Sequence, residues 1–323
     1  MATYKEIHGT SIEVLASDPS NPVLGQIWYN TTSQTLKGLE FAAAAWSSGG
    51  DLNTARYTLA GAGTQTAALG FGGEEGPGAK STATEEYNGS AWTNGGNLGT
   101  ARMQLGGAGT QTAGLAFGGA LPAFTAATEE YNGTAWTGGG ALPTARAQLA
   151  GAGIQTAGLA FGGSTSPPFA AIGTTSEYNG TSWTGGGAMG TARYNLGGAG
   201  TQTSALAFGG NSYSAATEEY NGTSWTAGGD LITGRNYASG CGASNTAALV
   251  ANGRTPSGDT TNTELYNGTS WTATASIILA RKQGASAGNT SAALSFGGLA
   301  PGVSVTTQEF NEASPATVTI SSS

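Results

Sequence analysis

The six residues YNGTSW occur three times in this chain, at 178–183, 220–225 and 266–271. Near copies, YNGSAW and YNGTAW, occupy 87–92 and 131–136. An Asn-Gly pair between runs of alternating apolar residues is the strongest short-range signal for a β-hairpin. A hairpin repeated in this way indicates the same corner of a recurring structural unit more than a set of separate binding sites.

The repeating unit is longer than the hairpin. An aromatic residue precedes each repeat Trp by five positions, an Arg follows it by ten, and a Gly-Gly doublet comes later, with Asn252-Gly253 in its place in the fifth unit. Successive Trp residues are 42 to 47 positions apart, which is the period of propeller blades. The markers are Trp46, Trp92, Trp136, Trp183, Trp225 and Trp271, with Arg56, Arg102, Arg146, Arg193, Arg235 and Arg281.

Each unit is predicted to hold four strands, a to d, with AQLAGAG, TAGLAFGG, ATEEY and TSWTGG as examples. If Asn-Gly forms a two-residue turn, Tyr178 pairs with Thr181 and Ser176 with Trp183. Tyr178 and Trp183 are then expected on one face as a diagonal pair between neighbouring blades. The sequence thus predicts an all-β chain, a six-bladed β-propeller of four-stranded antiparallel blades.

The order Gly-Gly, Tyr, Trp, Arg resembles the kelch repeat over about 38–311, and this resemblance implies the same propeller. The first Trp strand precedes the first Arg, so we expect both chain ends to close the ring. The last blade would take three strands from 282–311 and its outer strand from 43–49. Two segments, 35–41 and 305–310, both look like strand c, and either fits. The expected domains are an N-terminal docking hairpin at 1–36, the propeller at 37–311 and a tail at 312–323.

The net charge of −8, with only 11 basic residues, argues against nucleic-acid binding. The first ten residues have no apolar core, so we expect no signal peptide, and we expect no membrane insertion. One cysteine permits no intrachain disulfide. Cys241 stands where the other units have Ala, and we expect it to be packed and unreactive.

Most charges recur once per unit. Ten of the 15 Glu residues lie in the two positions before the repeat aromatic, and six of the 11 basic residues are the repeat Arg. Buried Arg requires carboxylates or carbonyl groups as partners. We therefore predict structural Arg–Glu or Arg–carbonyl links, with an anion-binding ring of Arg as the alternative.

The chain is predicted not to be an enzyme. Kelch-like copper oxidases hold their metal with His and Tyr, whereas this chain has a single histidine, His8, outside the repeats. Asp51 and Asp230 form a carboxylate pair only if blades three apart converge at the channel mouth. No catalytic residue, metal or cofactor is expected.

The Trp-to-Arg distance is constant and the Arg-to-doublet distance differs by one residue in the fifth unit alone, whereas the distance from the doublet to the next repeat aromatic, in the b–c loops, varies throughout. Variable loops on one face of a rigid scaffold are typical of recognition surfaces. Candidate ligand-binding residues in these loops are Lys80, Phe124, Phe169, Tyr213, Arg254 and Asp259. The aromatic ones either contact a ligand or fold over their own blade.

The segment GQIWYNTTSQTLKG at 25–38 resembles a short motif of structural proteins in tailed bacteriophages, which implies a virion protein docked through this region. Trp28 and Tyr29 are the docking candidates, although Trp28 also suits a cap on the propeller. We expect a virion appendage such as a tail fibre, made in the host cytoplasm, that recognises a host surface glycan or protein. A structural virion connector and a cellular kelch-type interaction module are the alternatives.

Overall fold

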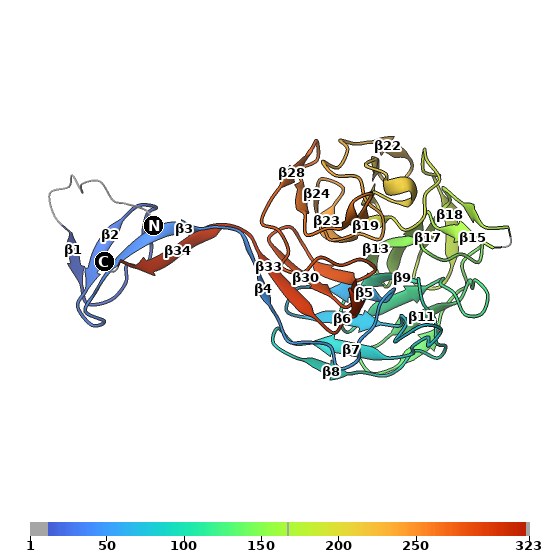
Figure 1. Cartoon of the computed structure of the whole chain (residues 1–323), viewed down its shortest axis with the longest axis horizontal. Coiled ribbons are helices and arrows are strands. Elements are labelled where there is room, and N and C mark those ends of the chain that lie inside the picture. The colour runs from blue at the N-terminus through green and yellow to red at the C-terminus, as the bar shows by residue number, and fades with distance from the viewer. Residues whose placement is uncertain (1–11, 167, 321–323) are drawn as a thin grey trace. The chain divides into compact units, whose positions relative to one another are not determined.

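A computed structural model describes residues 12–166 and 168–320 (Figure 1). The contacts between residues divide the protein into two units. The larger is Ala45–Asn311, and the smaller is formed by Met1–Ala44 with Glu312–Ser323. The division therefore falls after Ala44 rather than after residue 36. No helix in the described part of the chain is long and apolar enough to cross a bilayer. His8 lies outside the described residues.

The larger unit is a β-propeller. Its first blade contains β5 (Ala60–Gly63), β6 (Ala68–Phe71), β7 (Thr84–Tyr87) and β8 (Trp92–Asn94). The second contains β9 (Gly106–Gly109), β10 (Gly114–Phe117), β11 (Thr128–Tyr131) and β12 (Trp136–Gly138). The third contains β13 (Ala150–Ile154), β14 (Ala157–Phe161), β17 (Thr175–Tyr178) and β18 (Trp183–Gly186).

The remaining blades complete the ring. The fourth contains β19 (Gly197–Thr201), β20 (Ser204–Phe208), β21 (Thr217–Tyr220) and β22 (Trp225–Ala227). The fifth contains β23 (Ser239–Ser244), β24 (Ala247–Ala251), β27 (Thr263–Tyr266) and β28 (Trp271–Ala273). The sixth contains β29 (Ala285–Gly288), β30 (Ala292–Phe296), β33 (Thr307–Asn311) and β4 (Ala45–Ser48).

The ring closes in the predicted way. Strand β4, from the start of the chain, pairs antiparallel with β33 from its end, with Trp46 opposite Phe310. Each inner strand contacts the inner strands of both neighbours, and β29 contacts β5, so the described residues form a closed ring of six sheets. Of the two c-like segments, 305–310 supplies the blade, and 35–41 belongs to the smaller unit.

The b–c loops contain short elements of their own. Three carry two-stranded ribbons, and the loop of the fourth blade carries a 3-10 helix. These elements are β15 (Ser164–Thr165) with β16 (Ala170–Ala171), β25 (Arg254–Thr255) with β26 (Gly258–Asp259), β31 (Leu299–Ala300) with β32 (Gly302–Val303), and η1 (Asn211–Tyr213).

Glycine is frequent in the inner strands because a phenylalanine of the preceding blade lies over it. A Cβ atom on Gly107 would lie 2.9 Å from Cζ of Phe71, and one glycine in each of four other blades faces the Phe of its preceding blade in the same way: Gly61, Gly151, Gly198 and Gly240. In the sixth blade Ser286 takes the glycine position, and the preceding blade has Ala251 where the others have Phe. The two exceptions compensate for each other in volume.

Repeat Trp and Tyr side chains join neighbouring blades, as predicted. The indole N–H of each repeat Trp donates to a threonine hydroxyl of the preceding blade at 2.9 to 3.1 Å. Five repeat tyrosines donate their hydroxyl to a glutamate of the preceding blade, for example Tyr131 to Glu86. In the sixth blade Phe310 replaces the Tyr, and the preceding blade has Leu265 instead of Glu, so neither group is left unpaired.

The predicted register of the c–d hairpin is wrong: the turn lies one residue later, at Gly180 and Thr181, so the cross-strand partners shift by two residues. Tyr178 lies directly opposite Trp183, not Thr181, and their ring centroids are 4.8 Å apart. Only Gly180 of the Asn-Gly pair has a positive φ, 88°, which is the pattern of a type II′ turn with Gly first. Asn179 stays out of the left-handed region because its side-chain oxygen accepts the backbone N–H groups two and three residues later.

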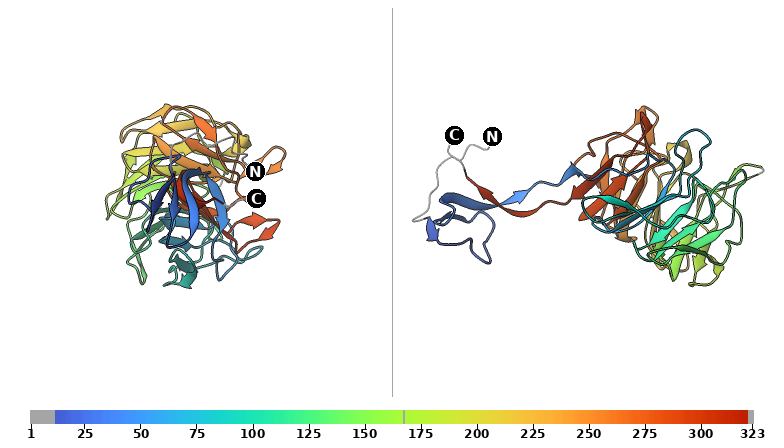
Figure 2. Two further views of the ribbon diagram at one scale, coloured as in Figure 1. Left: turned by 90° about the vertical axis from the view of Figure 1, so that its left-hand side faces the viewer. Right: turned by 90° about the horizontal axis from the view of Figure 1, so that it is seen from below.

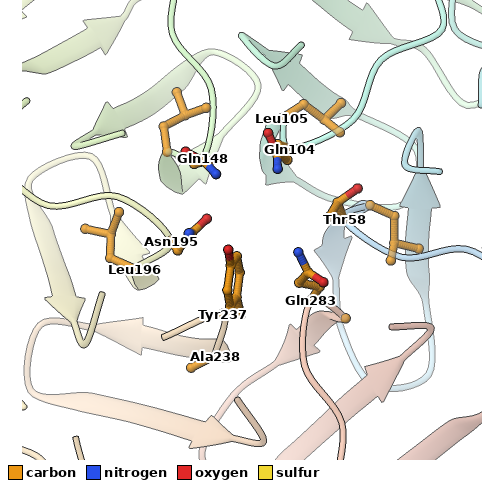
Figure 3. A pocket seen from close by; sticks show the side chains of 12 residues that line it. Thr58, Gln104, Leu105, Gln148, Asn195, Leu196, Tyr237, Ala238 and Gln283 are labelled. Carbon is orange, nitrogen blue, oxygen red and sulfur yellow. The ribbon is translucent and has the colours of Figure 1, made fainter. Parts of the chain in front are cut away.

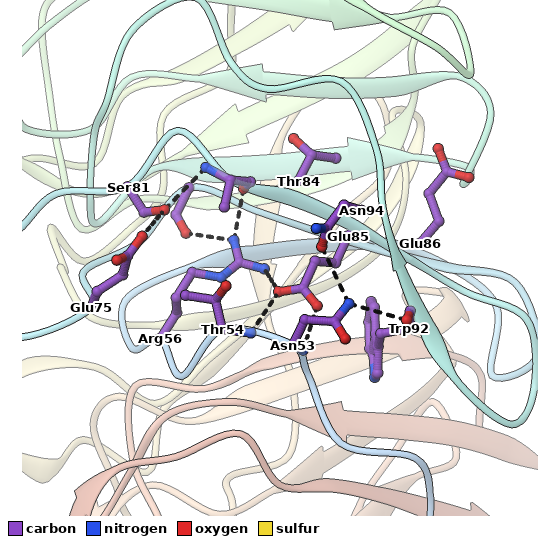
Figure 4. Close-up of polar contacts among 12 residues, drawn as sticks. Asn53, Thr54, Arg56, Glu75, Ser81, Thr84, Glu85, Glu86, Trp92 and Asn94 are labelled. Atoms are coloured by element: carbon purple, nitrogen blue, oxygen red, sulfur yellow. Dashed lines mark hydrogen bonds and ion pairs between the residues drawn. The ribbon is translucent and has the colours of Figure 1, made fainter.

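The repeat Arg residues are buried and bonded, which confirms the predicted links. In the first blade, Arg56 donates to the carbonyl groups of Gly72 and Ala83 and forms an ion pair with Glu85 at 2.9 Å (Figure 4). Three further blades repeat the pair, as Arg102–Glu129, Arg193–Glu218 and Arg235–Glu264. The third and sixth blades replace the Glu with Ser176 and Gln308.

The smaller unit is a four-stranded sheet in the order β1 (Glu13–Leu15), β2 (Ile27–Asn30), β3 (Thr35–Ala42) and β34 (Ser314–Thr319). The expected hairpin is therefore present, as β2 and β3. Figure 2 shows β3 and β34 running side by side, and they are paired from Lys37 to Ala42. Residues 314–319, expected to be part of a tail, thus form a strand.

Candidate functional site at the channel mouth

One position per blade, two residues after the repeat Arg, lines the mouth of the central channel on the b–c loop face (Figure 3). All six residues have left-handed backbones, with φ between 53° and 59°. They are Thr58, Gln104, Gln148, Asn195, Tyr237 and Gln283. We call this set the mouth ring.

The mouth ring is closed by backbone hydrogen bonds. Each residue donates its N–H to the carbonyl of the ring residue in the preceding blade, and Thr58 donates to Gln283, over distances of 2.7 to 3.2 Å. A left-handed backbone costs a non-glycine residue roughly 1–3 kcal/mol. Such strain persists only where the surroundings enforce it, and it is frequent at ligand sites. The repetition in six blades shows that ring closure enforces it here.

The mouth ring and the residue after each member line a cavity of about 100 Å³. Its polar side chains are three glutamines, an asparagine, a threonine and a tyrosine, so its lining is uncharged at neutral pH. Behind them lie leucines in four blades, but Ala238 and Gly284 in the fifth and sixth. The smaller residues make the cavity asymmetric and leave the most room beside Tyr237.

Tyr237 is the one mouth-ring residue with a titratable side chain. Burial and then the nearby Tyr194 and Tyr213 raise the pKa of its phenol, against the opposing effects of the Asn195 side-chain hydrogen bond and Arg254. The hydroxyl group therefore stays protonated at neutral pH and retains its proton for donation to a ligand.

Two of the predicted loop aromatics belong to this same region. Phe169 is 54% exposed and meets Tyr194 edge-on, with ring centroids 5.0 Å apart. Tyr213 ends η1, also with a positive φ of 55°. Together with Tyr194 and Tyr237 they form an aromatic group over the third to fifth blades. Phe169 thus both covers its neighbour and exposes a face.

The predicted charged residues of the fifth blade form a small ionic group beside the aromatic group. Arg254 and Lys282 both approach the carboxylate of Asp259, at 3.8 Å and 3.1 Å. The Arg254 side chain is 45% exposed. Two cations share one carboxylate, so the group carries a net positive charge at the rim of the mouth.

The other two predicted residues lie on the first and second blades. Lys80 pairs through its backbone with Glu74, and Phe124 with Ala120, each close to the base of its loop. Each loop starts beside a mouth-ring residue. In five blades residues 57, 103, 147, 236 and 282 bridge to 74, 120, 164, 254 and 299, and in the fourth blade Asn211 donates its N–H to the carbonyl of Tyr194. All the b–c loops therefore surround the mouth, but the predicted residues divide into two groups.

Asp51 and Asp230, which would form a carboxylate pair only if distant blades converged, each interact with the scaffold. Asp51 accepts the backbone N–H of Thr307 at 3.4 Å, and Asp230 lies near enough to Arg193 to raise the pKa of that guanidinium against the larger, opposite effect of burial. No group of three His, Cys, Asp or Glu residues able to hold a metal occurs in the described ranges. Cys241 is buried in the channel wall, and burial raises the pKa of its thiol to about 12, as its packing role predicts.

The N-terminal candidates occupy different surroundings. The Trp28 side chain is fully buried, and its indole N–H donates to Asp18 at 3.0 Å. Lys37 and Asn30 also bind Asp18 and, together with Trp28, lower the pKa of that carboxyl to about 2. Trp28 is therefore core of the small sheet and offers no surface for docking, whereas Tyr29 is half-buried.

The sequence prediction missed the mouth ring, Tyr194 and Tyr237. The prediction placed Gln148 at the start of an inner strand, whereas β13 begins at Ala150. The available signal was a position that is polar in every unit but not constant in identity, unlike the invariant Trp and Arg.

Comparisons with known proteins support the fold only. No protein-family model matches the chain, and no curated protein sequence matches it. Among solved structures, that of YjhT is similar, with a TM-score of 0.67 and 14% sequence identity over 83% of this chain and 99% of the other. At this identity the likeness, together with the repeated four-stranded sheets, shows that the chain adopts a β-propeller fold.

Proposed function

We propose that this protein is a non-enzymatic recognition module that binds a surface glycan at the mouth ring, with the b–c loops as the surrounding contact surface. The observation that carries the proposal is the mouth ring itself. Six strained polar residues converge on one cavity, and their identities vary while the scaffold around them repeats.

The chemistry of the cavity suits a neutral, hydroxyl-rich ligand. Side-chain amides both donate and accept hydrogen bonds, as sugar hydroxyl groups do. The leucines behind them and the aromatic group at the rim provide apolar surface for the C–H faces of a sugar ring. An anionic or cationic group entering the ring would find no opposite charge in the lining.

The size of the cavity argues for a ligand that continues beyond it. A volume of about 100 Å³ holds no more than a small part of an oligosaccharide. The rest of the chain would lie across the loops, where Phe169, Tyr213 and Arg254 are placed. Phe124 and Lys80 would meet a ligand that extends in the opposite direction.

The cellular context rests on the resemblance of residues 25–38 to structural proteins of tailed bacteriophages. We propose that the small sheet attaches the module to a virion appendage such as a tail fibre, where the ligand is a host surface glycan. Because Trp28 is buried, attachment would use the outer surface of the sheet, including Tyr29.

The test is binding of the purified full chain to bacterial cells and to their isolated surface polysaccharide. A variant with the loops at 120–126, 164–174 and 211–215 replaced by Gly-Ser should lose binding while its circular dichroism spectrum stays unchanged. Equal binding by both chains, or binding by neither across plausible hosts, would support a structural connector. Binding to a surface protein but not to polysaccharide would contradict a glycan ligand but would still support a recognition role.

A further inference from the structure

The third blade lacks a charge that four other blades possess. There, a buried Glu carboxylate pairs with the repeat Arg, but Ser176 occupies this position in the third blade. The sixth blade also lacks the Glu, but there the negative charge of Asp51 raises the pKa of Arg281 against the larger lowering by burial. Among the described residues, Arg146 forms no ion pair, and burial alone lowers its pKa to about 10.

The third blade also lacks a backbone N–H donor that binds the Glu carboxylate in the other blades. In the Glu-containing blades, the second carboxylate oxygen accepts the N–H of the residue seven positions after the repeat Trp, such as Asn53 or Gly190. In the third blade the seventh position is Pro143, which has no N–H. The carboxylate and one of its donors are thus absent together, and Thr144 follows with its own N–H and hydroxyl.

A cavity of about 240 Å³ opens at this point. Its lining includes Arg146, Thr144, Thr174, Thr175 and Ser176, and no acidic residue. The Arg146 guanidinium donates to Ser176 Oγ at 3.0 Å and to Thr174 Oγ1 at 2.9 Å. These bonds, with others to backbone carbonyl groups, occupy Nη1 and Nη2, whereas Nε has no hydrogen-bond partner. The positive charge is left without an opposite charge, which is costly in a buried position.

We propose that this cavity binds a small carboxylate anion in the place that a Glu side chain occupies in the other blades. The hydroxyl of Ser176 accepts from Arg146 and keeps its own hydrogen for the anion. Thr144, Thr174 and Thr175 supply further hydroxyl groups around it. The site is independent of the proposed glycan site, since the two cavities share no residue.

The test compares thermal unfolding of the wild-type chain and Ser176→Glu in increasing sodium formate at neutral pH. The added Glu supplies the carboxylate covalently, so general salt effects act on both proteins but specific binding acts on the wild type only. With a Kd of about 1 mM, about 100 mM formate should raise the wild-type Tm by about 5 °C more than that of the variant. An equal rise in both proteins, or none in the wild type, would overturn the proposal.

A direct measurement covers the case in which Ser176→Glu does not fold. Calorimetric titration of the wild-type chain with formate should give a saturable isotherm for one site. Acetate should compete, and a larger uronic acid should compete only if the cavity also accepts carboxylates carried by sugars. Absence of saturable formate binding would contradict the site.

Discussion

Glutamine side chains recur on both faces of the propeller, and the two faces use them differently. On the turn face, Gln65, Gln111, Gln155 and Gln202 each donate to two backbone carbonyl groups of the preceding blade. On the loop face, Gln104, Gln148 and Gln283 point into the mouth cavity (Figure 3). The turn-face glutamines join the blades, and we propose that those of the mouth ring present amides to a ligand.

The contrast shows how function can be located in a repeat protein. A side chain that is constant and bonded to the scaffold contributes to stability, and a position that varies while its backbone remains strained is free for recognition. Changes to the scaffold should therefore alter stability without altering binding, and changes to the mouth ring should do the reverse.

The largest effect should come from titrating the five Tyr–Glu links together. Burial, followed by the hydrogen bond to Glu, raises the pKa of Tyr87, Tyr131, Tyr178, Tyr220 and Tyr266 to about 12. The pKa of an unfolded tyrosine is about 10. The stabilisation is therefore complete below about pH 10 and is lost as the pH rises through about 12.

The measurement is Tm as a function of pH for the wild type and for Tyr131→Phe. Because the variant lacks one titrating link, its stability should fall less steeply over this range. Identical slopes for the two proteins would contradict a raised pKa for Tyr131.

Breaking one buried ion pair should have the next largest effect. Glu85→Ala leaves Arg56 buried and uncompensated and should lower the free energy of unfolding by about 3–5 kcal/mol. Ser176→Ala, at the matching position of the third blade, removes only a hydroxyl and should cost about 1 kcal/mol. Urea unfolding of both variants checks this, and similar losses would remove the distinction between the blades.

Removing one glutamine of the turn face should have a moderate effect. Gln111→Ala leaves two carbonyl groups without their side-chain donor and should cost about 1–2 kcal/mol. Ligand binding should not change. A weakened affinity with unchanged stability would reverse the roles of the two rings.

Relieving strain in the mouth ring should have the smallest effect on stability, with the opposite sign. Glycine adopts a positive φ without steric cost, so Gln104→Gly should raise the free energy of unfolding by about 1 kcal/mol or less. Gln111→Gly on the other face is the comparison and should be destabilising. A clear loss of stability in Gln104→Gly would mean that its side chain supports the scaffold.

The sequence predicted the scaffold because each blade repeats its own local signals. The fixed spacing of Trp, Tyr and Arg predicted the strands. The position of Trp46 before the first repeat Arg predicted that the start of the chain closes the ring, as β4 does by pairing with β33. The hairpin register was wrong because Asn-Gly suits two turn types, and the choice depends on whether Asn179 takes a positive φ or caps the turn. The sequence shows Leu265 in place of the repeat Glu and Phe310 in place of the repeat Tyr. Only the structure shows that these two positions belong to the same link between neighbouring blades.

The mouth ring was beyond prediction for a different reason. Its left-handed residues arise from a hydrogen-bonded circle of six segments that are distant in sequence, and no local pattern specifies a positive φ at Gln104 or Tyr237. Candidate residues in the b–c loops could be chosen from the sequence because variation in loop length is a local signal. Even so, the sequence did not show that Phe169 contacts Tyr194, that Arg254 lies near Tyr237, or that Lys80 lies on another blade.

The most direct test of the central claim is calorimetric titration of three proteins with an oligosaccharide from the surface polysaccharide of a bound host. Tyr237→Asn removes the aromatic side chain but introduces a residue that tolerates a left-handed backbone. Ile154→Thr changes an exposed turn-face residue to the one found in other blades. The account predicts at least about tenfold weaker binding for Tyr237→Asn, or about 1.4 kcal/mol, and unchanged binding for Ile154→Thr. Equal affinities for all three proteins would contradict a ligand site at the mouth ring.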